Sequence, residues 1–353
     1  MEISSWQLGL TYAGCFLGAG FVSGQELWQF FGSFGFSGIW SLLLSVAILC
    51  VFGILILYIS KKANISEMDK IVVRSDNKIL LRISAYTQCF FIFGIVVIMI
   101  AGMGALINQI SGMNVVAANL IMTIIVAVFA IFGLNGLVAV FSVSVPIIVV
   151  STIIFASIAI YNGDTNLENS IEIQKNTMLP NWFVSAITYA AYNMMATIGI
   201  ITPFGKKISS GKKIIIGIIS GCIMLLLVAL FIIISLSMHK SSVLTELPML
   251  SIAKEVNPFF SYLYGMLLLI GMFGTALSSI VALETFFSGK ARKIKEYRKS
   301  FVVILSLVAF FASLFGFGDL VGTVYPIFGY VSIVFLIMIS EHFVYIKKQM
   351  KRK

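Results

Sequence analysis

Charged residues are scarce in this sequence. Lysine, arginine, aspartate and glutamate make up 11% of its 353 residues, whereas 59% are hydrophobic, and the mean hydropathy is +1.05. A soluble domain of this length would have too few polar side chains to cover its surface. Apolar runs of about 18 residues or more recur, each long enough to cross roughly 30 Å of hydrocarbon. They lack the alternation of a barrel strand, so the sequence predicts an all-α polytopic membrane protein.

Residues for catalysis and metal chemistry are also few. The chain has two histidines and four cysteines, and all four cysteines lie inside apolar segments, where small packing residues are common. There is no Walker motif, no cluster of metal ligands and no nucleophile paired with a base. We therefore expect neither enzyme activity nor a cofactor. No lysine or arginine precedes the first apolar segment, which is unlike a signal peptide.

Ten apolar segments are expected to span the membrane. With both termini in the cytoplasm, every lysine and arginine except Lys175, Lys240 and Lys254 lies in a cytoplasmic loop or tail. This distribution follows the positive-inside rule and accounts for the net charge of +10 without a nucleic-acid partner. The short loops favour a bacterial plasma membrane. The expected spans are 5–32, 36–60, 83–110, 115–133, 136–160, 181–204, 211–238, 258–288, 300–317 and 322–346.

Two of the connecting loops have the pattern of short helices. Residues 65–80 place apolar side chains at helical spacing, which predicts a helix on the cytoplasmic surface. Residues 245–257 place Pro248 at a helix start with an apolar face behind it. This second helix is expected on the external side, either packed into a vestibule or lying at the interface.

The first span carries three glycines and an acid at its centre, where residues 18–26 read GAGFVSGQE. Glycine tolerates positive φ, so Gly18, Ala19 and Gly20 can leave helical geometry at low cost. A break frees carbonyls and N–H groups, which inside a bilayer require a polar cavity or a ligand. Carbonyls suit a cation, and a half-helix N-terminus suits a carboxylate. The alternative is a kink or close helix packing.

The sixth span has polar residues at a matching position. Tyr192 and Asn193 lie at mid-depth, and we expect a second helix break near Ala191–Met195. Spans 1 and 6 each begin a group of five, and because five is odd the two groups run in opposite directions. A single domain covering residues 1–353 is therefore predicted, with inverted repeats over about 5–160 and 181–346 and a substrate site between the broken helices 1 and 6.

These features resemble the LeuT-fold transporters of the amino acid–polyamine–organocation superfamily, and most of all the YkvI-like bacterial membrane proteins. The resemblance rests on GAGFVSGQELWQFF in span 1 and TYAAYN in span 6. It implies a sodium site between span 1 and span 8. The matching residues are Gly14, Leu17, Thr275, Ser278 and Ser279. The last three lie at i, i+3 and i+4, on one helix face, and five uncharged oxygens suit a monovalent cation. The alternative is that these hydroxyls only help helices to pack.

Other candidates are polar or aromatic residues at mid-depth. Glu26 would pair with a cationic substrate, carry a proton, or line a wetted vestibule. Glu284 would form a structural ion pair with the basic 290–299 segment or act at an inner gate. The candidate substrate-binding residues are Gly18, Ala19, Gly20, Phe21, Tyr189, Tyr192, Asn193 and Phe273, with Phe21 and Phe273 as apolar gates.

We expect a secondary transporter for a small organic solute, an amino acid or related amine, with sodium as the candidate coupling ion. The alternative is a nutrient sensor of the same fold, like the spore-germination membrane subunits, which would bind solute without passing it. The expected partners are a small-molecule substrate and the lipid bilayer. The sequence does not give an oligomeric state.

Overall fold

The computed structural model describes residues 3–74, 78–132, 137–163 and 176–351, and every regular element in these residues is a helix. The first half contains α1 (Ser5–Gly14), α2 (Ala19–Val22), α3 (Gln25–Phe30), η1 (Gly32–Phe34), α4 (Phe36–Ala63), α5 (Met68–Val72), α6 (Lys78–Ser111), α7 (Val115–Phe132) and α8 (Leu137–Asn162). The second half contains α9 (Trp182–Ile201), η2 (Thr202–Lys207), α10 (Gly211–Met238), η3 (Ser242–Leu244), α11 (Pro248–Val256), α12 (Pro258–Lys290), α13 (Arg292–Glu296), α14 (Arg298–Ser313) and α15 (Phe317–Lys351).

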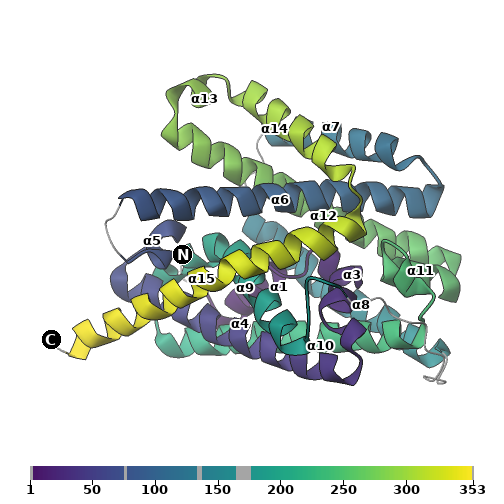
Figure 1. Ribbon diagram of the computed structural model, residues 1–353, viewed down its shortest axis with the longest axis horizontal. Helices are drawn as coiled ribbons and strands as arrows, with labels where there is room; N and C mark the ends of the chain where they lie inside the picture. The colour runs from purple at the N-terminus through teal and green to yellow at the C-terminus, as the bar shows by residue number, and fades with distance from the viewer. Residues whose placement is uncertain (1–2, 75–77, 133–136, 164–175, 352–353) are drawn as a thin grey trace.

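Eight helices of the described chain are long and apolar enough to cross a membrane. The other two expected spans correspond to the divided α1–α3 segment and to α14, which has 16 residues and a length of about 24 Å. The short helices expected in the loops are α5 and α11, and Pro248 occupies the first turn of α11. In Figure 1, α5, α13 and the C-terminus lie at the left and α11 lies at the right, so the two sets of loops face opposite ends.

The first span is interrupted twice. A capping box of Ser4 and Gln7 starts α1, which ends at Gly14, and the Gly18 N–H then donates to the Phe16 carbonyl at 2.7 Å. Gly24, at φ 85°, precedes α3 in the left-handed conformation that glycine favours. The expected interruption of span 1 is therefore confirmed, but it begins earlier than predicted, because Ala19–Val22 forms a helical turn.

The expected break in span 6 is wrong, because α9 is continuous from Trp182 to Ile201. The polar side chains at its centre find partners without opening the helix. The Tyr192 hydroxyl donates to the Glu26 carboxylate, and the Asn193 amide donates to the Tyr189 carbonyl one turn earlier, at 3.1 Å. The α-helix changes to a 3₁₀ helix only at Thr202, where Pro203 follows.

The boundary between the last two spans also differs from the prediction. The chain turns at residues 314–316, where Gly316 has φ 89°, and α15 starts at Phe317 rather than near residue 322. A left-handed glycine ends a helix more strongly than the polar Asp319, which lies within α15.

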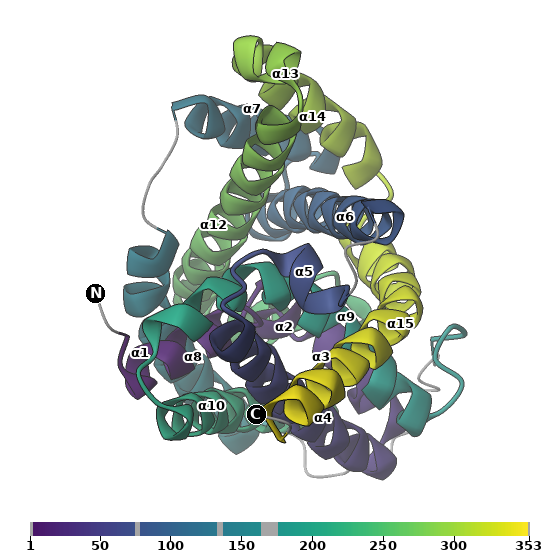
Figure 2. The ribbon, with the colours of Figure 1, turned by 90° about the vertical axis from the view of Figure 1, so that its left-hand side faces the viewer.

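In Figure 2, α1 enters from one side of the bundle, where it packs against α10 and α8, while α2 and α9 lie nearer the middle. Close packing of α1 on α10 depends on glycine, because a Cβ on Gly221 would lie 2.8 Å from the Gly9 carbonyl oxygen. On the opposite flank, α7 and α14 pack together outside α6 and α12 (Figure 2). The break in span 1 therefore lies inside the molecule, where freed backbone groups face protein rather than lipid.

Candidate functional site

A cavity of about 240 Å³ lies beside the end of α1. Its walls come from α1, α6, α9 and α12, and Met68 of α5 closes one side. Gly199, in this lining, is exposed. Met68, Gly199 and Phe286 lie within a few residues of the basic segments at Lys61–Lys62, Lys206–Lys207 and Lys290, so the cavity lies toward that end of the bundle. The cavity is lined by Gly14, Cys15, Gly18, Met68, Gln88, Cys89, Ile92, Ile95, Met195, Ala196, Gly199, Ile200, Thr275, Ser278, Ser279, Ala282, Leu283 and Phe286.

Four of the five candidate sodium-binding residues line this one cavity. They are Gly14 from α1 and Thr275, Ser278 and Ser279 from α12. The helical spacing of the three α12 residues accounts for their common face. Leu17 is the exception, because it is 4% exposed and lines a separate small hollow with Val22 and Ile148.

The oxygens around the cavity differ in how far they are already hydrogen-bonded. The Thr275 hydroxyl donates to the Gly271 carbonyl at 2.9 Å, and the Ser278 hydroxyl donates to the Thr275 carbonyl at 3.1 Å. No N–H in the described ranges donates to the carbonyls of Gly14 or Leu17 across the break. The end of α1 thus presents free backbone acceptors beside hydroxyl oxygens that can still accept.

These oxygens are uncharged. In the described part of the chain, no group of three or more His, Cys, Asp or Glu side chains is placed to hold a metal ion. A site made of carbonyl and hydroxyl oxygens at the negative end of a half-helix suits a hard monovalent cation better than a transition metal.

Gln88 of α6 is a lining residue that the sequence reasoning missed. It is 2% exposed, its amide donates to the Ser84 hydroxyl at 3.2 Å, and its Oε1 has no hydrogen-bond partner among the described residues. An unpaired buried amide oxygen is costly unless something else binds it. The available signal was a lone glutamine inside an apolar run, TQCFF.

Glu26 lies outside the cavity, in a cluster of aromatic side chains. Its carboxylate accepts from the Tyr192 hydroxyl, and it lies against Gly20, where a Cβ would be 2.6 Å from Glu26 Oε2. The Tyr192 ring stacks on Tyr325 with centroids 4.6 Å apart and an interplanar angle of 16°. Glu26 is 4% exposed, so it faces protein rather than lipid, which avoids the cost of a charge in hydrocarbon.

The candidate substrate-binding residues therefore fall into separate places. Gly18 lines the cavity, whereas Tyr189, Tyr192 and Asn193 are buried in α9. There Tyr192 donates to Glu26, the Tyr189 and Tyr192 rings are in contact, and Asn193 donates to the Tyr189 carbonyl. Phe21 is buried, and the side chain of Ala19 lies outside the described residues. Phe273 packs edge-on against Phe129 of α7, with centroids 5.4 Å apart, so its ring contacts α7.

Glu284 forms a structural ion pair. Its carboxylate accepts from Arg298 Nε at 3.2 Å and from the Ser288 hydroxyl at 2.8 Å. Only 8% of the Glu284 side chain is exposed. Of the two roles considered for Glu284, this geometry favours a contact that ties α14 to α12.

Polar contacts join the C-terminal end of α3 to the N-terminal end of α15. The Gln29 amide donates to the Gly318 carbonyl at 3.2 Å, and Asn176 donates to Gln29 Oε1 at 3.3 Å and to the Gly322 carbonyl at 2.7 Å. The Gly318 N–H donates to the Glu246 carboxylate. Burial raises the pKa of Glu246 above its ordinary value. The hydrogen bond from the Gly318 N–H partly offsets this rise, and the charge of Asp319 adds to it.

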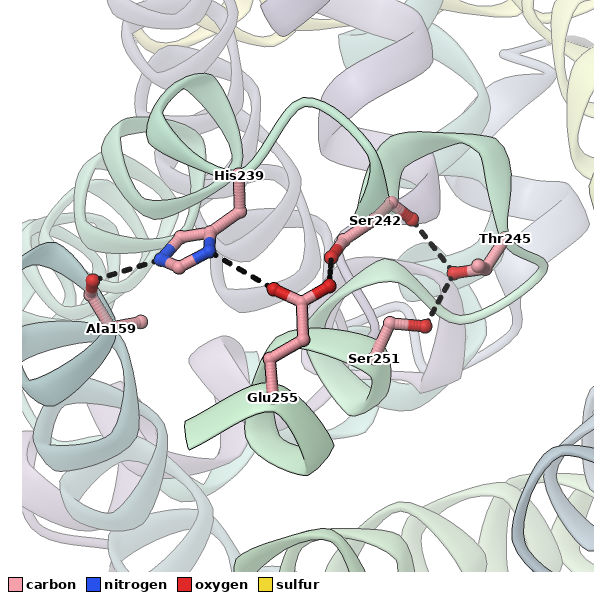
Figure 3. A network of polar contacts seen from close by, with 6 residues as sticks. All are labelled: Ala159, His239, Ser242, Thr245, Ser251 and Glu255. Atoms are coloured by element: carbon pink, nitrogen blue, oxygen red, sulfur yellow. Dashed lines mark hydrogen bonds and ion pairs between the residues drawn. The ribbon is translucent and has the colours of Figure 1, made fainter. Parts of the chain in front are cut away.

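A second polar network holds α11 at the same end of the bundle (Figure 3). His239 lies between the Ala159 carbonyl, 3.0 Å from Nε2, and the Glu255 carboxylate, 3.2 Å from Nδ1. Glu255 also accepts from the Ser242 hydroxyl at 3.0 Å. The network connects α8, the segment after α10, and α11.

No protein-family model matches the chain. It is 27% identical over 342 residues to the uncharacterized membrane protein YkvI of Bacillus subtilis (strain 168), a match that covers 94% of each chain. It is 24% identical over 338 residues to the uncharacterized protein YyaD of the same organism, covering 94% of this chain and 96% of YyaD.

Two solved transporter structures have a similar fold. A Na⁺-coupled sialic acid symporter in a substrate-bound outward-open state matches with a TM-score of 0.62 and 12% identity, over 95% of this chain and 78% of the symporter. Mhp1 in an inward-facing conformation matches with a TM-score of 0.62 and 14% identity, over 97% of this chain and 77% of Mhp1. The chain is thus a multi-pass membrane protein similar to YkvI, with the fold of these transporters.

Proposed function

We propose that this protein is a secondary transporter that moves a small organic solute, an amino acid or related amine, by alternating access with sodium as the coupling ion. The observation that carries the proposal is the cavity at the broken first span, which gathers Gly14, Thr275, Ser278 and Ser279. The fold shared with a Na⁺-coupled symporter over 95% of the chain supports it.

Sodium would bind between α1 and α12. The free carbonyls at the end of α1 and the hydroxyls of Ser278 and Ser279 are the oxygens offered to it, with a backbone oxygen of Thr275. Leu17 contributes through its backbone carbonyl, so the burial of its side chain elsewhere does not remove it from the set. An ion that bridges two helices favours the conformation in which they are close.

The solute would occupy the remaining cavity beside Gly18 and Gln88. Gln88 Oε1 is a buried acceptor without a described partner, which suits an N–H or ammonium donor. The residues of the Glu26 cluster do not line this cavity, so in this proposal they act on the opposite side of the break, as a coupling or gating group.

The proposed architecture has ten spans in two inverted repeats, about 5–160 and 181–346, in one domain, with α1–α3 and α14 among the spans. Both termini would be cytoplasmic in a bacterial plasma membrane, because the basic segments lie at one end. The cavity would then face the cytoplasm, and the contacts of Gln29, Asn176 and Glu246 would close the outer end.

Substrate binding measured over a sodium titration, with potassium as the replacement ion, tests the proposal. Amino acids and amines are first screened by thermal shift, because a ligand that binds the native state raises its stability. Sodium should raise substrate affinity, and by linkage substrate should raise sodium affinity by the same factor. Ser278→Ala with Ser279→Ala should raise the sodium half-saturation concentration about tenfold, which corresponds to about 1.4 kcal/mol.

Ser157→Ala is the matched control, because Ser157 is exposed on α8 and its hydroxyl donates to its own helix at 2.7 Å. This variant should behave like the native protein. Substrate affinity that does not respond to sodium would contradict the coupling ion. Saturable binding without solute flux in liposomes would contradict transport and point to a sensor.

A further inference from the structure

A second hollow lies on the outer side of α6, α12 and α14. It has a volume of about 360 Å³, and its lining includes Phe90 and Phe93 of α6, Phe287 of α12, and Ile304 and Val308 of α14. Phe90, Ile304 and Val308 are 61%, 61% and 52% exposed. We call this hollow the α6/α12/α14 groove. We propose that it binds an acyl chain of an anionic phospholipid. Arg82, Lys290 and Arg298, at one end of the groove, would hold the headgroup.

The apolar part of the groove suits a hydrocarbon chain. Every described side chain along it is aliphatic or aromatic apart from the phenol of Tyr86 and the thiol of Cys89. An extended peptide segment in the groove would leave its backbone N–H and C=O groups without partners there, whereas an acyl chain has no polar groups to satisfy.

The charge at one end of the groove selects an anionic headgroup. Each of the three helices places a cation one turn from a groove residue: Arg82 precedes Tyr86 by four residues, Lys290 follows Phe287 by three, and Arg298 precedes Phe301 by three. The Lys290 ammonium lies 5.0 Å from the Tyr86 ring centroid and 4.2 Å from that of Phe286.

Few of these cations are neutralised. Arg298 shares its charge with Glu284, and the nearby Glu296 pairs with Arg292 at 3.1 Å. Neither Arg82 nor Lys290 forms an ion pair with a carboxylate of the described chain. Three cations and one carboxylate leave an excess of two positive charges, which complements a phosphodiester without a balancing amine.

The groove shares a wall with the cavity. Cys89 and Leu283 line both hollows, so an acyl chain in the groove packs against the wall of the candidate transport site. A lipid bound in the groove would favour the conformation in which Cys89 and Leu283 form this shared wall. This consequence rests on the proposed function, whereas lipid binding itself does not.

Native mass spectrometry of the full-length protein, titrated with phosphatidylglycerol or phosphatidylcholine of matched chains, tests the binding. The native protein should bind phosphatidylglycerol at least about fivefold more tightly. Arg82→Gln with Lys290→Gln should remove this preference, and Val308→Trp, which fills the groove and keeps every charge, should lower the affinity for both lipids. The controls are Lys212→Gln with Lys348→Gln, two exposed cations on α10 and α15, and Ile223→Trp, at a position as exposed as Val308.

Equal affinity for the two lipids, or variants that bind like the native protein, would overturn the proposal. A change in oligomer mass in Val308→Trp without a change in bound lipid would also overturn it, by showing an interface between copies. If Arg82→Gln with Lys290→Gln does not fold, the comparison of Val308→Trp with Ile223→Trp tests the proposal. A protein that binds phosphatidylglycerol but carries no solute contradicts only the transport proposal; solute flux without lipid preference contradicts only this one.

Discussion

Glu26 is buried among aromatic rings, where its carboxylate accepts from Tyr192. Tyr192→Phe removes this donor and should lower the free energy of unfolding by about 1–3 kcal/mol, because the carboxyl loses its partner. Glu26→Gln with Tyr192→Phe should cost less than the sum of the two single changes, since the partners act as a unit. Thermal melting in detergent measures this, with Tyr262→Phe, an exposed tyrosine of α12, as control. Strictly additive effects would contradict the pairing.

Gly20 leaves room for the same carboxylate. An added Cβ would lie 2.6 Å from Glu26 Oε2 and 3.3 Å from its Cβ, so Gly20→Ala should displace the acid and destabilise the protein. Gly274→Ala is the matched control, because nothing lies within 4 Å of the added Cβ, and it should be neutral or stabilising by up to about 1 kcal/mol. Melting temperatures compare the two.

The Gly20 prediction has an internal check. Glu26→Ala removes Oε2, the nearest atom that the new methyl group would meet, and leaves only the Glu26 Cβ at 3.3 Å, so Gly20→Ala should be better tolerated in that background. If Gly20→Ala destabilises the Glu26→Ala protein as strongly as the native one, the backbone at the break requires glycine for another reason.

At the scale of helices, the sequence predicted positions well but only one of the two interruptions. Inside a bilayer each backbone polar group must be satisfied within its segment, so a long apolar run is almost always a helix; α10 begins and ends at the expected residues. A break depends on partners that lie far along the chain. Tyr192 meets Glu26 across 166 positions, a contact that no local pattern contains, and α9 therefore stays whole.

The candidate site shows the same limit. The spacing of Thr275, Ser278 and Ser279 fixes their common face because helix geometry is regular, and all three line the cavity. Whether Phe273 or Gln88 faces that cavity depends on the rotation of their helices against neighbours. Phe273 packs on α7 and Gln88 lines the cavity, and apolar runs without a polar face do not encode this rotation.

The helix α11 is held by side-chain contacts that can be removed one at a time. Nε2 of His239 faces the Ala159 carbonyl, which can only accept, so Nε2 carries a hydrogen. On the other side of the ring, the Glu255 carboxylate contacts Nδ1 and also accepts from the Ser242 hydroxyl (Figure 3). Glu255→Ala should make the amides of α11 exchange roughly fivefold faster, for a loss of about 1 kcal/mol at this partly exposed site.

Hydrogen exchange followed by mass spectrometry of residues 248–256 measures this effect. Lys254→Ala is the control, because Lys254 is the exposed neighbour of Glu255 on the same helix. If both variants speed exchange equally, the effect comes from alanine at the surface and the network does not hold α11.

Across the whole molecule, the two ends of the bundle differ. The cavity lies toward the basic segments, whereas at the other end α3, α11 and α15 are joined by the contacts of Gln29, Asn176 and Glu246. Under the proposed function, these contacts would close the end away from the cavity, because a transporter with both ends open together would act as a channel. Conversion to the opposite state would have to break these polar contacts and close the cavity around α1.

Cys15 reports this asymmetry, because it lines the cavity and is partly exposed. With the other three cysteines replaced by alanine, a membrane-impermeant maleimide should modify Cys15 faster in inside-out vesicles than in intact cells, since the basic end is expected in the cytoplasm. Sodium with substrate should slow this modification, because the occupied site closes around α1, and a tenfold slowing would correspond to about 1.4 kcal/mol.

A protein that keeps only Cys222, which is 4% exposed and lies outside the cavity lining, should resist the reagent from both sides. Equal modification of Cys15 from the two sides would show that the cavity is not the path from the cytoplasm, whereas a rate that ignores sodium and substrate would leave the path in place and remove the coupling.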